Sequence, residues 1–230
     1  PRETRAEKKA RKRRENPPLA PRDRWRRLGL MTLAGVLTFL SFPFTTEALN
    51  DLHGSASGEH VPSVKLANPL DGTAPFLRRA LVPSLLQVAH RNLSRGFTDL
   101  ALFEAGIVFC PEPGIEYGTP VVPPAAARPD ADTLAALDAA IPPQPRHIAV
   151  LLTGNIVSKQ PGQPAVAVSI VDALDAVRTI AHAVGVQIDV VQTQRAALHP
   201  GRAGALMVGE HEVGYVGEVL PAVSAEADVP

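Results

Sequence analysis

The clearest pattern of apolar and polar positions lies between residues 68 and 110. From Ala80 to Arg95, apolar residues recur three or four positions apart, which is the spacing of one face of an amphipathic helix. Arg95 stands in the last turn, where a cation suits the helix dipole, and Gly96 can take the left-handed conformation that ends a helix. The pattern therefore predicts a helix over Ala80–Arg95. Its buried face comprises Leu81, Leu85, Val88, Ala89, Asn92 and Leu93.

Two strands are predicted on either side of this helix. Asp99–Cys110 is almost uninterrupted apolar sequence, short enough for a buried strand, and Glu104 is the charge inside it. Upstream, Asn68-Pro69 closes an apolar segment, because proline lacks an N–H donor and biases the preceding residue away from helix. We therefore expect a strand at Val64–Ala67 that ends there.

The remaining patterns mix strands and helices without regular βαβ alternation. This mixture predicts an α+β fold, mainly an antiparallel sheet flanked by helices. The expected elements are strands at Val36–Phe42, Arg146–Thr153 and Val186–Val191, a hairpin of Ala203–Val208 and Val213–Val219 joined through residues 209–212, and a helix at Ser169–Val184 capped by Gly185.

Composition supports a folded body with an irregular insert. At 230 residues, the chain can hold one sizeable core or two small ones, built largely from Ala, Val and Leu because aromatics are only 4%. Nine of the 23 prolines fall in Pro111–Pro145, which indicates a surface insert. Within it, Asp130–Ala140 is a possible short helix with Asp132 or Thr133 as N-cap.

The net charge of zero hides a basic arm ahead of an acidic body. Residues 1–27 hold 12 Lys/Arg against 4 Asp/Glu, which leaves 11 against 19 for the rest. We expect residues 1–21 to be a disordered arm, either a solvated lead-in or a contact to nucleic-acid phosphates. Residues 22–221 then form the core module, and residues 222–230 a tail.

The apolar run Leu28–Phe44 has two interpretations. It follows three arginines and is 17 residues long, at the short edge of the roughly 17–25 residues that span a bilayer. A single-pass membrane protein is therefore one hypothesis. The other splits the run at Gly35 into a helix ending near Ala34 and the strand at Val36–Phe42.

Charged and amide side chains at apolar positions are the candidates for function. Glu104 is costly to bury, so it needs a partner, and Arg78, Arg95 or Arg202 can provide one. Asn92 must find hydrogen-bond partners or lie at a subunit seam.

A second candidate is the segment His199-Pro200-Gly201-Arg202, which is predicted to turn at the rim of the sheet. Arg202 can hold a carboxylate or phosphate, or pair internally with Glu218 or Glu104.

The sequence lacks the common motifs of metal binding, serine hydrolysis and nucleotide binding. The seven histidines show no H-x-x-x-H or H-x-H spacing, and there is no G-x-S-x-G elbow, no G-x-x-x-x-G-K-[ST] loop and no G-x-G-x-x-G after a strand. Cys110 is the single cysteine. We expect no metal site.

The order of these residues resembles the β subunit of bacterial phenylalanine–tRNA ligase, in its catalytic-like module. The resemblance rests on two blocks. The first block comprises Asn68-Pro69-Leu70, Arg78, Leu81-Val82-Pro83-Ser84-Leu85-Leu86, Asn92, Arg95-Gly96 and Leu102-Phe103-Glu104-Ala105-Gly106. The second block comprises His199-Pro200-Gly201-Arg202-Ala203 and Gly214-Tyr215-Val216-Gly217-Glu218-Val219-Leu220-Pro221.

The resemblance implies a class II synthetase-like fold without its catalytic groups. The segment Gly214–Pro221 contains Glu218 but lacks the arginine that grips ATP phosphates in an active copy. It also implies that Thr45–Leu49 opens a helix. One departure is that Ser169–Gly185 lacks the lysine-glycine pair of the family.

The resemblance implies that the chain is part of a subunit of a cytoplasmic α2β2 ligase and has no membrane contact. The partners are the α subunit and tRNA(Phe); ATP and magnesium belong to the α subunit and to upstream segments that this fragment lacks, and none is bound here. We expect Ala80–Arg95 and Leu28–Phe44 to form the intersubunit surface. A free-standing tRNA-binding paralogue remains the other hypothesis. The structural or interface residues are Arg78, Asn92, Arg95, Glu104, His199, Arg202 and Glu218.

Overall fold

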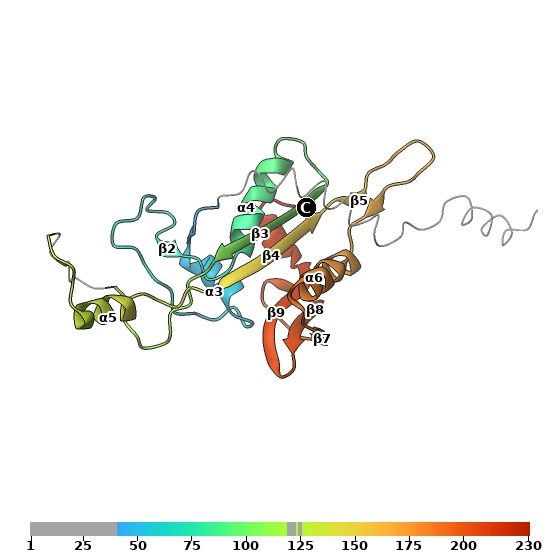
Figure 1. Cartoon of the computed structure of the whole chain (residues 1–230). Helices are drawn as coiled ribbons and strands as arrows, with labels where there is room; N and C mark the ends of the chain where they lie inside the picture. Colours follow the sequence, from blue (N-terminus) through green and yellow to red (C-terminus); the bar gives the residue numbers. More distant parts are fainter. Residues whose placement is uncertain (1–40, 119–122, 124–125) are drawn as a thin grey trace, which may run out of the picture.

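The computed structural model describes residues 41–118, 123 and 126–230 and shows an α+β fold (Figure 1). The strands are β1 (Phe44–Thr45), β2 (Phe76–Leu77), β3 (Leu100–Ile107), β4 (Arg146–Thr153), β5 (Asn155–Val157), β6 (Val166–Ala167), β7 (Asp189–Gln192), β8 (Leu198–Val208) and β9 (His211–Val219). The helices are α3 (Glu47–Gly54), α4 (Val82–Leu93), α5 (Ala131–Ala139), α6 (Ile170–Val184) and α7 (Pro221–Glu226).

Every strand pair among the described residues is antiparallel, as predicted, but the pairs form four sheets where the sequence suggested one. These are β1-β2, β3-β4, β5-β6 and β7-β8-β9. The single sheet is not formed because β4 and β9 are not hydrogen-bonded to each other; both instead contact α6.

The core lies where α4 packs on β3 and β4. Leu85, Val88 and Ala89 of α4 meet Leu102 of β3, and all four are almost fully buried. Removing a leucine of this kind from water contributes about 1.5–3 kcal/mol. Residues packed around this cluster include Leu93, Leu100, Ala149, Leu151 and Val229.

The predicted helix and strand of this core are confirmed with shorter bounds. α4 begins at Val82, with Pro83 in its first turn, and Gly96 has the expected positive φ of 88°. β3 ends at Ile107 because the next residues bond elsewhere: the Phe109 N–H donates to the Arg78 carbonyl at 2.9 Å. β4 has the predicted bounds.

The segment before β2 differs from its prediction. Within Val64–Ala67 only Lys65 forms a bridge, to Phe76, so a full strand there is wrong. The partner strand is limited to two residues, and Pro75 beside it has no N–H to donate.

The described end of the apolar run 28–44 is not helical. Residues 28–40, and with them most of the predicted strand Val36–Phe42 and the helix ending near Ala34, lie outside the described residues. Phe44 belongs to β1, so one continuous helix over the whole run is wrong. Among the helices that the structure describes, none has the length and hydropathy to cross a bilayer. The expected helix opening at Thr45–Leu49 is confirmed by α3, whose N-cap Thr46 accepts from the Leu49 N–H at 3.3 Å.

The helix of the proline-rich insert is α5, and its N-cap is Asp130 rather than Asp132 or Thr133. The Asp130 carboxylate accepts from the Thr133 N–H at 2.7 Å, because Asp130 is the last residue in extended backbone. No residue of α5 is buried.

α6 and the hairpin follow the prediction more closely. The Ser169 N–H donates to the Asp172 carboxylate at 2.9 Å where α6 begins, and Gly185 ends it with φ of 72°. The hairpin turn is Gly209-Glu210, tighter than the predicted 209–212. β7 begins three residues later than predicted.

The largest correction concerns His199-Pro200-Gly201-Arg202. These residues lie within β8 and not in a turn, because Leu198 pairs with Val219 of β9 and the strand resumes pairing at Ala203. An irregularity of register between these two pairs accommodates Pro200, which cannot donate to the ladder.

Candidate functional site

A buried ion pair joins two of the residues that the sequence singled out. Arg78 Nη1 lies 2.8 Å from Glu104 Oε1, and the side chains are only 6% and 7% exposed. The same nitrogen donates to Ser41 Oγ at 2.6 Å and to Ser84 Oγ at 3.3 Å. Arg78 Nε donates to the Ile107 carbonyl at 3.1 Å. Of the three arginines considered, Arg78 is therefore the partner of Glu104.

The surroundings indicate that this pair is structural. A Cβ at Gly106 would lie 2.5 Å from Arg78 Nη2, so glycine leaves the room that the guanidinium fills. Ser41 Oγ donates a short hydrogen bond to Glu104 Oε1, while Glu104 Oε2 is buried and has no hydrogen-bond partner among the described residues. The pair thus ties the chain before β1 and the first turn of α4 to β3.

A second predicted pair forms at the surface. Arg202 bonds Glu218 across β8 and β9, with the two side chains 58% and 42% exposed. His199 Nδ1 accepts from the Gly201 N–H at 3.2 Å. Arg202 is thus paired internally with Glu218 and not with Glu104.

Asn92 and Arg95 stay apart from both pairs. Asn92 Nδ2 donates to the Val88 carbonyl at 2.8 Å, within its own helix, so its amide has a partner without a subunit seam. Arg95 is exposed and forms no ion pair within the described part of the chain. The apolar face of α4 is covered by β3 and β4, so exposed apolar area on α4 no longer argues for an interface there.

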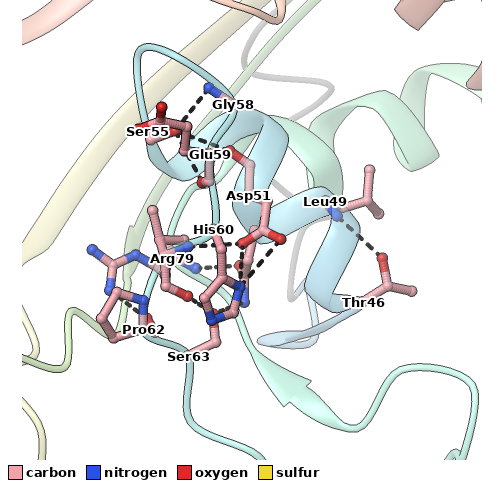
Figure 2. A network of polar contacts seen from close by, with 12 residues as sticks. Thr46, Leu49, Asp51, Ser55, Gly58, Glu59, His60, Pro62, Ser63 and Arg79 are labelled. Carbon is pink, nitrogen blue, oxygen red and sulfur yellow. Dashed lines mark hydrogen bonds and ion pairs between the residues drawn. The ribbon is translucent and has the colours of Figure 1, made fainter. Parts of the chain in front are cut away.

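A polar network beside α3 was missed by sequence reasoning. Asn50 is 1% exposed; its Nδ2 donates to Ser63 Oγ at 3.1 Å and to the Leu77 carbonyl at 3.0 Å, and its Oδ1 accepts from the Arg79 N–H at 2.9 Å. Arg79 Nη1 donates to the Pro62 carbonyl at 2.6 Å (Figure 2). The only sequence signal is an asparagine on the apolar side of a short helix.

The same network orders the loop that follows α3. Asp51 Oδ1 accepts from the Val61 N–H at 2.9 Å, and His60 Nδ1 lies 3.4 Å from that carboxylate (Figure 2). Ser55 Oγ accepts from the Gly58 N–H at 2.9 Å. The polar loop between α3 and Val61 is therefore held to α3 by side chains that local patterns do not reveal.

A cleft of about 910 Å³ separates the two larger sheets. It is lined by the whole of β4, by one side of α6 and by most of β9, with His53 and Arg79 also on its wall. Burial lowers the pKa of His53 to about 4, so this imidazole is neutral at pH 7. No local pattern in the sequence indicates this cleft, because its three walls come from separate segments of the chain.

One aromatic side chain on the cleft wall is held by a cation. The guanidinium of Arg195 lies 4.2 Å from the centre of the Tyr215 ring and also pairs with Glu212. Burial raises the pKa of Tyr215, and burial likewise raises that of Cys110. Neither group is thereby activated as a nucleophile. No three His, Cys, Asp or Glu side chains gather as a metal site in residues 41–118, 123 and 126–230.

Comparison with known proteins identifies the family. The family model described as the phenylalanyl tRNA synthetase beta chain CLM domain matches residues 3–230. The chain belongs to this family. Similar curated proteins are the phenylalanine–tRNA ligase beta subunits of Leifsonia xyli (50% identical over 89% of this chain and 25% of the relative), Thermobifida fusca (38%, 90% and 26%) and Mycolicibacterium paratuberculosis (34%, 86% and 24%).

The chain spans about a quarter of the length of the curated relatives it matches. The match covers both residue blocks on which the resemblance rested. In this domain the first block forms α4 and β3 around the Arg78–Glu104 pair, and the second forms β8 and β9 with the Arg202–Glu218 pair.

Proposed function

We propose that the chain is the catalytic-like module of a phenylalanine–tRNA ligase β subunit, with a class II synthetase-like architecture. The observation that carries the proposal is the family match over residues 3–230 together with relatives that are all named as β subunits of this ligase. The module supports ATP-dependent attachment of phenylalanine to tRNA(Phe) by pairing with the α subunit in a cytoplasmic α2β2 assembly.

In this proposal the module contributes no catalytic group. Phenylalanine, ATP and magnesium bind to the α subunit. There the carboxylate of phenylalanine attacks the α-phosphate of ATP and displaces pyrophosphate to give an adenylate, and a ribose hydroxyl of tRNA then takes the phenylalanyl group and displaces AMP. The internal pairing of Arg78 with Glu104 and of Arg202 with Glu218 supports this division, because an arginine committed to a carboxylate is not free to hold a phosphate.

The surface that meets the α subunit includes the C-terminal end of α4 in this proposal. Arg95 is exposed there, and Phe97 two residues later is 60% exposed although it is aromatic. Arginine and aromatic residues are enriched at the centres of protein interfaces. Asn92 lies about one turn before Arg95, at the end of α4.

The proposal is tested by assembly of a chimeric subunit. This chain replaces the matched 210 residues in the Leifsonia xyli β subunit, which is then expressed with the α subunit of that organism. We expect the α subunit to copurify with the chimera at equal stoichiometry, and not with a β subunit from which those residues are deleted. A folded chimera that retains no α subunit would contradict the proposal and favour a free-standing tRNA-binding paralogue.

The variant Asn92→Ala refines this test. Its amide hydrogen bond to the Val88 carbonyl lies within one helix, so its removal costs only about 0.5–1.5 kcal/mol of fold stability. We expect a larger loss, tenfold or more, in the affinity of the chimera for the α subunit, measured by sedimentation. Asn155→Ala in the same chimera is the control, since Asn155 bonds Asp99 in another part of the fold. Equal effects of Asn92→Ala on melting and on assembly would remove Asn92 from the interface.

A further inference from the structure

The sequence holds one Asp-Gly step, Asp71-Gly72, and no Asn-Gly step. At such a step the backbone nitrogen of glycine reaches the side-chain carbon Cγ of the preceding residue with little obstruction, because glycine has no Cβ. Gly72 meets this condition, since a Cβ built on it would have no heavy atom within 4 Å. The step is therefore placed for a reaction within the chain itself.

Asp71-Gly72 lies at the tip of a loop that is held at its base. There the Leu66 N–H donates to the Pro75 carbonyl at 2.8 Å. Beyond this base, residues 70–73 are all exposed. Water therefore has direct access to the Asp71 carboxyl group and to the peptide bond that follows it.

Thr73 controls the state of the Asp71 carboxyl group. Asp71 Oδ1 accepts from the Thr73 N–H at 2.8 Å and from the Thr73 hydroxyl at 2.7 Å. These hydrogen bonds, above all the one from the hydroxyl, lower the pKa of Asp71 below its usual value. No charged side chain among the described residues contributes to this lowering, and Lys65 of the same loop lies over the Phe76 ring. Thr73 is thus the residue that holds this carboxyl group in its ionised form.

The reaction that the step permits requires the neutral acid. The Gly72 nitrogen attacks Cγ of Asp71 and loses its proton, and one carboxyl oxygen leaves as water, which closes a succinimide ring. A carboxylate must first gain a proton before it loses water in this way. At pH 7, lowering a carboxyl pKa by one reduces its neutral fraction about tenfold. The hydrogen bonds from Thr73 therefore slow the closure of the ring.

Water then opens the succinimide ring at one of its two carbonyl carbons. Attack at Cγ restores aspartate. Attack at the former main-chain carbonyl carbon breaks its bond to the Gly72 nitrogen, so that the main chain runs through Cβ and Cγ and the product is isoaspartate. One water leaves and one water enters, so the mass is unchanged and no oxidant takes part.

We propose that Asp71-Gly72 is a self-modification site, at which aspartate converts to isoaspartate at a rate that the Thr73 hydroxyl restrains. Thr73 acts through Asp71 and is a positioning residue. In the product the former Asp71 carbonyl is a free carboxylate, so the turn in which it accepts from the Ala74 N–H at 3.2 Å is lost. The hydrogen bond between Leu66 and Pro75 at the base of the loop is retained.

The experiment ages the full chain at pH 7 and measures isoaspartate by methyl transfer from a protein L-isoaspartate methyltransferase, with its position assigned by mass spectrometry. We expect isoaspartate at residue 71 and not at Asp130, whose carboxylate also accepts from a threonine N–H but which precedes alanine. A succinimide peptide lighter by one water should appear before it. Equal modification at the two positions would overturn the proposal. So would none at residue 71 over a time that modifies the same chain unfolded in urea.

Three variants identify the role of Thr73. Thr73→Val removes the hydroxyl donor and keeps the size of the side chain, so we expect isoaspartate to form at least about threefold faster. Thr73→Ser keeps the donor and should modify at the rate of the unchanged chain. Gly72→Ala is sterically permitted, because Gly72 has open space around it and no positive φ, and it should slow the reaction at least about tenfold.

The pH profile and an unfolded reference separate this role from a change in loop structure. The rate should fall as the carboxyl group ionises with rising pH, and the fall should be centred at higher pH in Thr73→Val, whose carboxyl pKa is lowered less. In urea, where the hydrogen bonds from Thr73 are absent, Thr73→Val and the unchanged chain should modify equally fast. The proposal is overturned if folded Thr73→Val is no faster, or if it is faster by the same factor in urea.

Discussion

The Arg78–Glu104 and Arg202–Glu218 pairs show how burial determines the effect of an ion pair on stability. Because burial removes both charges from water, a buried ion pair need not make a protein more stable than apolar residues in the same place. Removing one partner is costly, however, because it leaves the other charge buried and uncompensated. The first pair is 6–7% exposed and the second 42–58% exposed. The same chemistry therefore has different consequences at the two positions.

Glu104→Ala is expected to lower the free energy of unfolding by about 3–5 kcal/mol, because the Arg78 guanidinium would remain buried without its carboxylate. Glu218→Ala, the control in the exposed pair, is expected to cost about 1 kcal/mol or less. Urea denaturation of both variants measures the difference. Similar costs at the two positions would contradict the structural role assigned to Glu104.

His53 gives the stability of the chain a dependence on pH. Burial lowers its pKa from 6.5 to about 4, so between these pH values the unfolded chain binds a proton that the folded chain does not. The free energy of unfolding is therefore full above about pH 6.5 and falls toward pH 4, by up to about 3 kcal/mol from this group. The pKa of His147, lowered by burial, acts in the same direction.

His53→Gln should flatten that fall, measured by urea denaturation at several pH values. His60→Gln is the control, because the His60 side chain is 69% exposed. If His60→Gln changes the pH dependence of the free energy of unfolding as much as His53→Gln does, burial of His53 is not the cause of that dependence.

At the scale of elements, the junction of β4 and β5 depends on one glycine. Gly154 has φ of 77°, and a Cβ there would lie 2.2 Å from the Thr98 carbonyl oxygen. Beside it, Asp99 accepts from the Asn155 N–H at 2.9 Å and from the Ser158 hydroxyl at 2.7 Å, and the hydrogen bond from Ser158 is the main cause of its lowered pKa. The end of β4 is thus tied to the start of β3.

Gly154→Ala is expected to destabilise the chain by about 3 kcal/mol or more, from the left-handed backbone together with the clash. Gly162→Ala isolates the backbone effect, because Gly162 has φ of 75° and open space around it; about 1–2 kcal/mol is expected. Thermal melting of the two variants gives the comparison. Equal losses of stability in Gly154→Ala and Gly162→Ala would mean that the clash with the Thr98 carbonyl is relieved at no cost in free energy.

Elements set by local signals were predictable from the sequence. Ser169 and Gly185 limit α6, Gly96 follows α4 with positive φ, and the apolar pattern of β4 has the observed bounds, because caps and periodicity act within a few residues. A cationic partner for Glu104 was predictable for a different reason, since a carboxylate in an apolar strand requires a cation nearby. The choice of Arg78 over Arg95 and Arg202 was not predictable, and only the structure decides it.

Features set by long-range pairing were not predictable. Pro200-Gly201 has the composition of a turn, but pairing of Leu198 with Val219 draws these residues into β8. Asn50 joins residues 63, 77 and 79, and no local pattern specifies those partners. The cleft arises from the relative positions of β4, α6 and β9, which the order of elements does not fix.

At the scale of the whole molecule, the two larger sheets are separate among the described residues. Residues 3–230 match the family model although β3-β4 and β7-β8-β9 are separate among the described residues. Under the proposed function the module contributes assembly with the α subunit, so charging of tRNA should depend on its presence and not on any one of its polar side chains.

The most direct test of this account is phenylalanine-dependent charging of tRNA(Phe) by the Leifsonia xyli ligase carrying the chimeric β subunit. We predict charging within about tenfold of the native ligase, and loss of at least about 100-fold, or 2.7 kcal/mol, when the module is deleted. Charging by the deletion enzyme at the native rate, with its α subunit still bound, would contradict the account.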